Sequence, residues 1–278
     1  MTRLAALESI ALSRCKKLSL LLSRQGRDHH ELSRVGSDAM SATLKVKVWR
    51  GREAGAFAHY DVPRQDSQTV LDVVTHIQRH LEPALAYRFA CRVGMCGSCA
   101  MAVNGKACWT CRTHVANVAG EGGEVEIGPL ANLPVIKDLV TDMRTFFDKW
   151  ARAKGRFAGA ATRADAFARV EPASAPRRAA DAGIECIGCG VCYASCDVVA
   201  WRPEYLGPAA LNRAWTLVND ERDVEQKERL RAVAGDAGCH ACHTQGSCTE
   251  RCPKHISPTF SIAGLKRTVA KAAARGRL

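Results

Sequence analysis

Two periodicities divide the first part of the chain into strands and a helix. Residues 43–49 alternate between apolar and polar side chains, the pattern of a β-strand with one buried face, and a second strand is predicted over 56–62. Apolar residues then recur at the spacing of an amphipathic helix, at Val70, Val73, Val74, Ile77 and Leu81. This order predicts one helix packed on a small sheet.

Further apolar patterns follow along the chain. Val125 and Ile127 indicate a closing strand, and a helical stripe is predicted over 136–150. Its members are Ile136, Leu139, Val140, Met143, Phe147 and Trp150. Closer to the C-terminus, helical sequence is predicted over about 208–233 and a basic helix over 262–274, so this part should be mostly α-helical.

These patterns divide the chain into four segments. Residues 1–40 lack clear strand or helix signals and are interpreted as a disordered or non-native extension, with Met40 as an alternative start. Residues 41–150 form the predicted sheet domain, and 151–182, rich in Ala and Arg, form a linker. Residues 183–278 form the predicted helical domain, so the fold class is α+β.

Charge and cysteine content narrow the function classes. The formal net charge is +12, and the basic excess lies in residues 1–40, 151–180 and 263–278. Basic flanks favour acidic membranes or partner subunits, and because no binding motif accompanies the charge, no nucleic-acid partner is predicted. No apolar run is long enough to span a bilayer. The 14 cysteines, spaced for metal, indicate assembly in a reducing compartment.

The cysteine-rich loop after the predicted helix carries the first candidate metal site. Its spacing is C-x4-C-x2-C, and a later single cysteine completes the signature of a plant-type [2Fe–2S] site. The predicted ligands are Cys91, Cys96, Cys99 and Cys111. Strands, helix and cysteine loop follow in the order of a β-grasp ferredoxin.

A predicted hairpin supports the choice of the fourth ligand. Asn104-Gly105 is a strong two-residue turn, which pairs Cys99 with Thr110 and brings Cys111 near Cys99. Cys108 is the alternative. We prefer Cys111 on the spacing of plant-type ferredoxins and interpret Cys108 as a strand thiol that packs in the interior.

Two later cysteine runs predict two further clusters. Residues 186–196 read C-x2-C-x2-C-x3-C, and residues 242–252 follow the same template. In bacterial-type ferredoxins three cysteines of such a run hold one cluster and the fourth crosses to the other. The predicted [4Fe–4S] ligands are Cys186, Cys189, Cys192 and Cys252. The predicted [3Fe–4S] ligands are Cys196, Cys242 and Cys248, because Gln245 replaces the expected fourth thiolate and an amide is a poor iron ligand.

Other uses of these cysteines are weaker. Structural zinc usually takes two cysteine pairs, and disulfide frameworks are typical of short secreted chains. Cys239 forms a second C-x2-C pair with Cys242, and we interpret it as a packing residue or as one that supports the site without binding iron. Cys15 lies in the extension and has no predicted role.

Over roughly residues 41–275 the chain resembles the iron–sulfur subunit of succinate dehydrogenase and fumarate reductase, the respiratory complex II family. The motifs that carry the resemblance lie at residues 91–101, 134–140, 185–189, 206–210, 242–244 and 252–255. The resemblance implies that a partner subunit with FAD oxidises succinate in the tricarboxylic acid cycle. Electrons then pass singly through [2Fe–2S], [4Fe–4S] and [3Fe–4S] to a quinone of the respiratory chain, or in reverse for fumarate reduction.

The resemblance also implies partners and a location. The chain would lie on integral-membrane anchor subunits, at the cytoplasmic face of a bacterial inner membrane or the matrix face in mitochondria. No residue of this chain is expected to act on the dicarboxylate. By similarity, the quinone-proximal residues would be Trp201, His243, Gln245 and Lys266. An indole or ammonium N–H can donate to a quinone oxygen, and a histidine can assist proton uptake.

One departure from the family pattern concerns the third cluster. Asp197 follows Cys196 where the family usually has proline, and an ionised carboxylate there should make the three-iron cluster harder to reduce. The alternative function is electron transfer in a heterodisulfide-reductase-like or other flavoprotein complex. A third class is a free ferredoxin or a zinc-dependent interaction protein. The [2Fe–2S] domain and Gln245 favour the interpretation as an electron-transfer subunit of the complex II family.

Overall fold

The computed structural model describes residues 43–120 and 123–278, so the predicted extension, including Cys15 and Met40, lies outside the described residues. The alternation at the start of the patterned sequence forms strand β1 (Thr43–Gly51). Its side chains at Leu44, Val46 and Val48 are buried, as predicted for a strand with one face toward a core.

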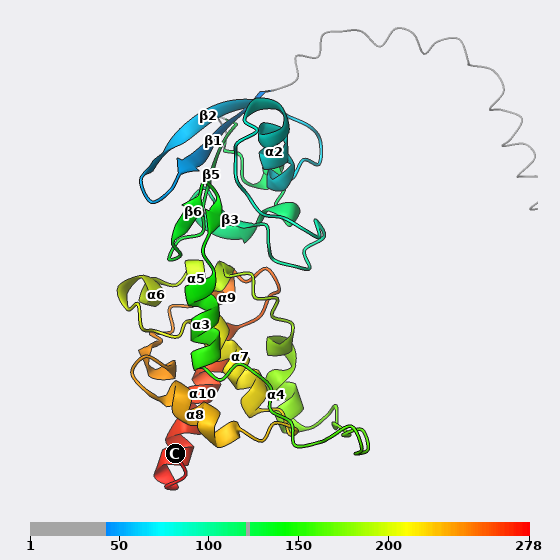
Figure 1. The fold of residues 1–278 in the computed structure, drawn as a ribbon, viewed down its shortest axis with the longest axis vertical. Helices are drawn as coiled ribbons and strands as arrows, with labels where there is room; N and C mark the ends of the chain where they lie inside the picture. Colours follow the sequence, from blue (N-terminus) through cyan, green and yellow to red (C-terminus); the bar gives the residue numbers. More distant parts are fainter. Residues whose placement is uncertain (1–42, 121–122) are drawn as a thin grey trace, which may run out of the picture. The chain divides into compact units, whose positions relative to one another are not determined.

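A five-stranded sheet supports the first cysteine loop (Figure 1). The strands lie in the order β2-β1-β5-β3-β4, with β1 antiparallel to β2 and parallel to β5. The other strands are β2 (Gly55–Pro63), β3 (Ala100–Val103), β4 (Lys106–Trp109) and β5 (Glu124–Gly128). Strand β5 confirms the closing strand predicted around Val125 and Ile127, and both of these side chains are buried.

Helix α2 (Val70–His76) packs its apolar face on the sheet core. It begins with a capping box, in which the Thr69 hydroxyl accepts the Asp72 N–H at 3.2 Å and the Asp72 carboxylate accepts the Thr69 N–H at 3.0 Å. The chain then continues as a π-helical segment, η1 (Ile77–Leu81). The wider turn changes the helical phase, so Leu81 is 46% exposed and does not join the predicted apolar face.

The helical stripe predicted over 136–150 is wrong in its first half. These residues form strands β6 (Val135–Lys137) and β7 (Val140–Thr141), a two-stranded antiparallel sheet, followed by helix α3 (Arg144–Arg152). The predicted face is also wrong within α3, because Phe146 is buried in the core and Phe147 is 54% exposed.

Asp138 explains why this region is not helical. Its backbone has φ of +51°, a left-handed conformation that interrupts a right-handed helix. The conformation is held because the Asp138 carboxylate accepts the backbone N–H of Gly51 at 2.8 Å and of Ala86 at 2.9 Å. Two partners that are distant in sequence therefore override the local apolar spacing.

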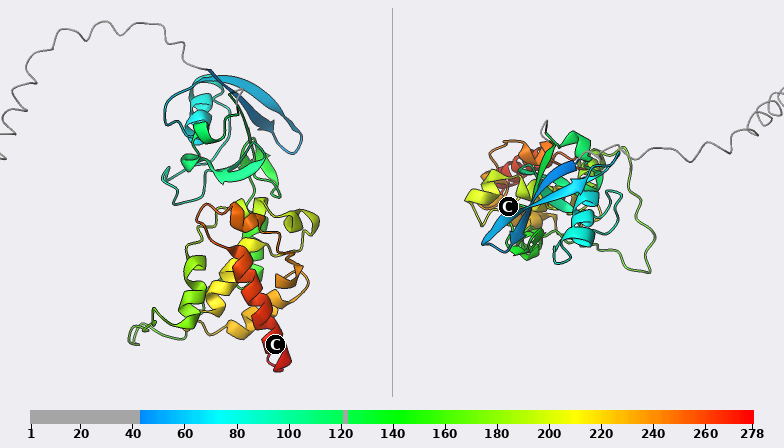
Figure 2. Two further views of the ribbon diagram at one scale, coloured as in Figure 1. Left: turned by 180° about the vertical axis from the view of Figure 1, so that it is seen from behind. Right: turned by 90° about the horizontal axis from the view of Figure 1, so that it is seen from above.

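The C-terminal part is helical, as predicted (Figures 1 and 2). Its α-helices are α4 (Ala175–Ile184), α5 (Val191–Ala194), α6 (Asp197–Trp201), α7 (Pro208–Val218), α8 (Gln226–Ala234), α9 (Ser247–Glu250) and α10 (Pro258–Ala274). Helix α4 begins inside the segment predicted as a linker. The helical run predicted over about 208–233 is divided, since residues 219–225 separate α7 from α8. The predicted basic helix is α10.

Close packing of α7 against α10 organises the helical core. A side-chain Cβ on Gly264 of α10 would lie 2.5 Å from the Trp215 ring of α7, so only glycine fits there. Short 3-10 turns complete the chain: η2 (Thr110–Arg112), η3 (Val115–Asn117) and η4 (Cys239–Ala241). In the described ranges, no helix combines the length and the apolar character needed to cross a bilayer.

Candidate metal centres

The first cysteine group lies in the loop between η1 and β3. The backbone N–H groups of Met95 and Cys96 donate to Cys91 Sγ at 3.2 and 3.3 Å, so the loop curves around this sulfur. Hydrogen bonds, first from the Ser98 side chain and then from the backbone of Cys91 and Ser98, lower the pKa of Cys96 to about 6. A low thiol pKa favours the thiolate, which is the form that binds iron.

The β3–β4 hairpin has the predicted register and brings the later cysteine to this loop. Asn104 and Gly105 form the turn, both with positive φ, and Thr110 donates to the Cys99 carbonyl from its N–H at 3.2 Å and its hydroxyl at 2.8 Å. Cys111 follows directly, and its thiol packs in one buried cluster with Cys99.

The two thiols lie in a buried apolar cluster with Leu71. Burial, together with the neighbouring Cys99, raises the pKa of Cys111 to about 11. Cys108 instead packs against the sheet core, where burial raises its pKa. The geometry therefore favours Cys111 over Cys108 as the partner of Cys99.

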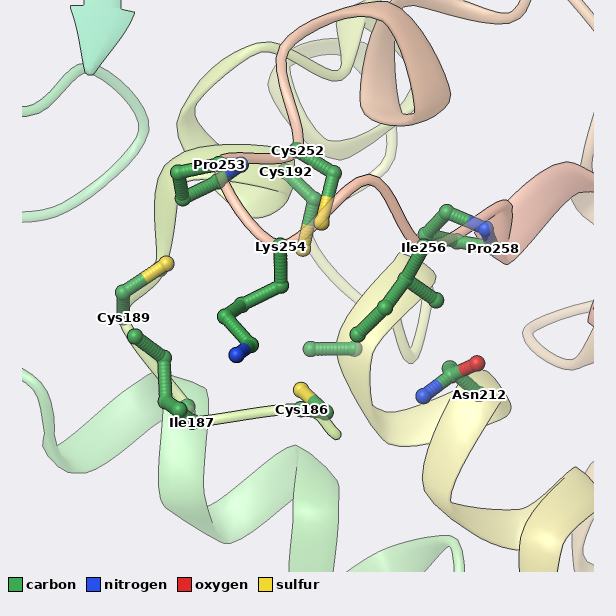
Figure 3. Close-up of a pocket in the computed structure, with 13 residues that line it drawn as sticks. Cys186, Ile187, Cys189, Cys192, Asn212, Cys252, Pro253, Lys254, Ile256 and Pro258 are labelled. Carbon is green, nitrogen blue, oxygen red and sulfur yellow. The ribbon is translucent and has the colours of Figure 1, made fainter. Parts of the chain in front are cut away.

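The second group surrounds a cavity in the helical part (Figure 3). Its four cysteines are Cys186, Cys189, Cys192 and Cys252. The first three come from one run, in which Gly188 and Gly190 have φ of +64° and +79° and let the chain curve around the cavity. The fourth comes from the turn before α10. Burial is the main cause that raises the pKa of Cys189 to about 11.

The third group surrounds a separate cavity with three cysteines. Cys196, Cys242 and Cys248 line it together with the loop 243–247 and the side chains of Val198, Tyr205, Pro208, Thr259 and Ile262. The Thr244 N–H lies 3.4 Å from Cys242 Sγ, and Thr259 Oγ1 lies 3.5 Å from Cys248 Sγ. Burial raises the pKa of the Cys196 thiol, and the neighbouring Cys248 and Cys242 add to the rise.

These donor sets fit clusters of several irons. Within residues 43–120 and 123–278, no three His, Cys, Asp or Glu side chains converge tightly enough to hold one metal ion, and the described cysteines form no disulfide. Thiolates on separate corners of a cluster stand farther apart than thiolates on a single zinc ion. Sulfur ligands around apolar cavities are the donor chemistry that iron–sulfur clusters require.

The four residues predicted near a quinone are not all brought together. His243 and Gln245 are exposed and line the third cavity. Lys266 does not line it, but its ammonium donates to the carbonyl of Cys242 at 2.7 Å. Trp201 is the last residue of α6 and is 66% exposed, outside the cavity lining.

The structure also places Asp197 and Cys239, for which the sequence suggested roles near the third group. Asp197 is the first residue of α6, and its side chain is exposed, so water screens the carboxylate more than a buried charge would be screened. Cys239 is fully buried in the core of the helical part and does not line the cavity. A packing role fits its surroundings.

Sequence reasoning missed several residues that shape the third group. Tyr205, 1% exposed, lines the cavity together with Cys242. Burial is the largest cause that raises the pKa of Tyr205. The buried Lys149 donates to the Tyr193 hydroxyl at 2.7 Å, and burial lowers the pKa of Lys149. Only the position of Tyr205 directly before Leu-Gly-Pro gave a sequence signal.

Comparisons with known proteins agree with this distribution of cysteines. Residues 43–148 match the family model of a 2Fe-2S iron-sulfur cluster binding domain, and residues 183–256 match that of a 4Fe-4S dicluster domain. The chain is 36% identical over 224 residues to the fumarate reductase iron-sulfur subunit of Escherichia coli O6:H1, covering 79% of this chain and 90% of that protein.

Two further similar proteins are a succinate dehydrogenase subunit and a chain of an Sdh1 complex. The identity is 35% over 234 residues with a mitochondrial succinate dehydrogenase (ubiquinone) iron-sulfur subunit of Oryza sativa subsp. japonica, covering 82% of each chain. A chain of the Mycobacterium smegmatis Sdh1 complex in the apo form superposes with a TM-score of 0.74 at 30% identity, covering 84% of this chain and 98% of that one. Three cysteine groups on a sheet domain and a helical domain, together with this similarity over most of its length, mean that the chain belongs to the family of iron–sulfur subunits of fumarate reductase and succinate dehydrogenase.

Proposed function

We propose that this chain carries single electrons between a flavoprotein subunit with FAD and a quinone, through three iron–sulfur clusters. The observation that supports the proposal is that four cysteines line one cavity and three line another, while Cys91 and Cys96 share a loop and Cys99 and Cys111 share a buried cluster. The clusters, when bound, supply one-electron redox chemistry. The protein supplies their ligands, and at the second and third sites it supplies mainly apolar cavity linings.

The proposed ligand sets follow the three groups. The [2Fe–2S] cluster is held by Cys91, Cys96, Cys99 and Cys111, in a domain of β-grasp plant-type ferredoxin fold. The [4Fe–4S] cluster is held by Cys186, Cys189, Cys192 and Cys252, and the [3Fe–4S] cluster by Cys196, Cys242 and Cys248, in a domain of bacterial-type ferredoxin fold. The three-cysteine cavity supports the last assignment, because Gln245 lines it without supplying sulfur.

Backbone and side-chain donors prepare the sulfur atoms for electron transfer. N–H groups directed at Cys91 Sγ and a hydroxyl beside Cys248 Sγ stabilise negative charge on these ligands. Hydrogen bonds to ligand sulfur raise the reduction potential of an iron–sulfur cluster. These donors would therefore adjust how readily the first and third sites accept an electron.

The quinone is proposed to approach the third site. The exposed His243 and Gln245 belong to the loop that lines this cavity, and Lys266 holds the loop through the Cys242 carbonyl at 2.7 Å. His243 can supply a proton to a reduced quinone oxygen, and Gln245 can donate a hydrogen bond to it. Trp201, exposed at the end of α6, is proposed to lie along the same approach.

Integral-membrane anchor subunits are proposed to present the quinone to this loop. The chain would then lie on the cytoplasmic face of a bacterial inner membrane, or on the matrix face in mitochondria. The basic residues of α10 and its C-terminal extension, Lys266, Arg267, Lys271, Arg275 and Arg277, support contact with acidic headgroups or an acidic partner face.

The ligand assignment is tested by a matched pair of cysteine variants of the purified complex. Cys111→Ser should abolish the [2Fe–2S] EPR signal and lower the iron content by two atoms per chain, because Cys111 lies with Cys99. Cys108→Ser, three residues earlier in β4, should keep both, because Cys108 packs against the sheet core. Loss of the signal in Cys108→Ser with retention in Cys111→Ser would overturn the assignment, and a complex with fewer than three clusters would overturn the proposed function.

A further inference from the structure

The loops of the first two candidate sites approach each other at Gly97. If Gly97 carried a Cβ, that atom would lie 2.5 Å from Cys189 Cβ and 2.8 Å from Cys189 Cα. Carbon atoms in proteins do not approach this closely without a shift, and Cys189 Cα is backbone that cannot rotate away. Only glycine therefore allows the observed contact.

This contact joins two proposed ligand segments. Gly97 directly follows Cys96 of the first group, and Cys189 belongs to the second. A cavity of about 230 Å³ lies beside the contact and is lined from both sides, by Ser98 of the first loop and by Ile187 and Gly188 of the second among others. The two loops thus face each other across a narrow space.

The second loop is held in place beside the contact. The Asn132 side-chain amide donates to the carbonyls of Tyr193, Ala194 and Cys196 at 3.1, 3.2 and 3.2 Å, which ties the segment after β5 to the second cysteine run. Near Cys189, Gly190 packs under Met143, whose Cε would lie 3.2 Å from an added Cβ. The second loop cannot retreat from the contact without breaking these interactions.

We propose that Gly97 is a positioning residue for electron transfer, because its missing side chain sets the separation between the [2Fe–2S] and [4Fe–4S] sites. When both clusters are bound, Cys96, Gly97 and Cys189 would form the protein path between them. One electron crossing this path would leave the first site oxidised and the second reduced, with no bond formed or broken. Electron tunnelling falls exponentially with distance, so a small displacement at this contact slows the step. The inference rests on the proposed ligand sets.

The test compares three glycine-to-alanine variants in the purified complex. Gly97→Ala introduces the clash with Cys189. Gly94→Ala, in the same loop at φ of +73°, imposes the same backbone strain, but its Cβ would meet only Arg112 and Trp109. Gly123→Ala, at φ of +66° just before β5 and outside the cysteine groups, would place its Cβ in open space. These two controls separate the effect of backbone strain at a positive φ from the effect of the steric clash with Cys189.

The readouts are spectroscopic. Iron and sulfide analysis of the unaltered complex first establishes which clusters are present. An error in the proposed ligand sets is therefore detected before, and separately from, any change in transfer rate. In Gly97→Ala we expect a several-fold slower appearance of reduced [4Fe–4S] signal in freeze-quench EPR, and a weaker relaxation of the [2Fe–2S] spin by the reduced neighbour. Both controls should keep the unaltered rate between the two sites and the unaltered spin relaxation.

Two results would overturn the inference. One is a transfer rate in Gly97→Ala equal to that of the unaltered complex, or an equal loss of rate in either control. The other applies when Gly97→Ala loses the four-iron cluster altogether. In that case the test is made on the unaltered complex. The inference requires that reduction of the [4Fe–4S] site speeds the spin relaxation of the [2Fe–2S] site, and the absence of this effect would refute the inference.

Discussion

Asp138 shows how one buried carboxylate can join segments that are far apart in sequence. Its side chain accepts hydrogen bonds from the backbone N–H groups of Gly51 and Ala86, and from Arg50 Nε at 3.1 Å. Burial raises the pKa of this carboxyl, but the hydrogen bonds from Ala86, Gly51 and Arg50 outweigh it and lower the pKa below the ordinary 3.8. Asp138 is therefore held as the carboxylate.

This lowered pKa makes a contribution to stability that depends on pH. Because the pKa of Asp138 is lower in the folded chain than in the unfolded chain, the contribution is complete above the ordinary pKa of 3.8 and is lost as the pH falls through the folded value. At about pH 6 we expect Asp138→Asn to reduce the free energy of unfolding by about 1–3 kcal/mol, since charged hydrogen bonds are lost. The apparent midpoint of thermal unfolding measures this.

The difference between Asp138→Asn and the unaltered chain should shrink as the pH is lowered to about 3, because the carboxylate is then protonated in both states. Asp142 supplies the control. Its pKa is also lowered, first by hydrogen bonds from Arg144, but the Arg144 side chain is 86% exposed, so solvent screens the pair and Asp142→Asn should change the midpoint little. A difference for Asp138→Asn that is constant over this pH range would contradict the expectation.

At the scale of elements, the parts predicted best are those that depend on neighbouring residues. Alternation over 43–49 gave β1, and Asn104-Gly105 gave the hairpin whose register places Thr110 on Cys99. Both signals are local, because a strand face and a two-residue turn depend on a few adjacent side chains. The grouping of cysteines was equally accessible, since ligand spacing is a property of short runs.

The missed features depend on distant partners. The apolar spacing over 136–150 is that of a helix, and it predicted one. It carries no information on the hydrogen bonds from Gly51 and Ala86 to Asp138, which hold this segment out of a helix. The close approach of Gly97 to Cys189 could not be predicted either. The glycines of each loop are already accounted for by the turns of that loop, so nothing in the sequence indicates a contact between the two loops. The sequence therefore predicted local elements better than the contacts between distant segments.

A buried ion pair fixes helix α8 to the segment that precedes α4. Arg229 Nη2 donates to Asp223 Oδ2 at 2.7 Å and to the Arg156 carbonyl at 3.1 Å, and the same carboxylate accepts the Ala158 N–H at 3.0 Å. Both side chains of the pair are fully buried. This network also explains the break between α7 and α8, because Asp223 must face inward at that point.

Breaking this pair should be costly. Arg229→Ala leaves the Asp223 carboxylate buried without its cation, which should reduce the free energy of unfolding by about 3–5 kcal/mol. Arg222→Ala removes an exposed partner of Asp220 and should cost less than about 1 kcal/mol. Urea unfolding followed by circular dichroism compares the two. Equal shifts for both variants would mean that the buried pair does not hold α8 in place.

Across the whole molecule, the two cysteine runs of the helical part depend on each other. Cys252 of the later run lines the cavity of the earlier one, and Cys196 of the earlier run lines that of the later. Neither cavity can be complete unless both runs are folded. With Gly97 against Cys189, the three groups form a continuous series inside residues 42–278, which is one compact unit.

A series of sites can be interrupted at its end without disabling its beginning. Cys248 is 7% exposed and belongs to the third group, so Cys248→Ser should remove the three-iron EPR signal. Succinate should still reduce the [2Fe–2S] site through the flavoprotein, and a soluble dye that accepts electrons from the flavoprotein should still be reduced. Quinone reduction should fall to background, because electrons no longer reach the loop with His243.

Cys239→Ser is the matched control for this interruption, because Cys239 is a fully buried core thiol three residues from Cys242 that does not line the third cavity. It should keep the three-iron signal and quinone reduction. If Cys239→Ser lost both while Cys248→Ser kept them, the ligand set of the third site would be wrong. If Cys248→Ser lost the signal but still reduced quinone at the unaltered rate, the quinone would have to receive electrons from an earlier site, and the order of the series would change.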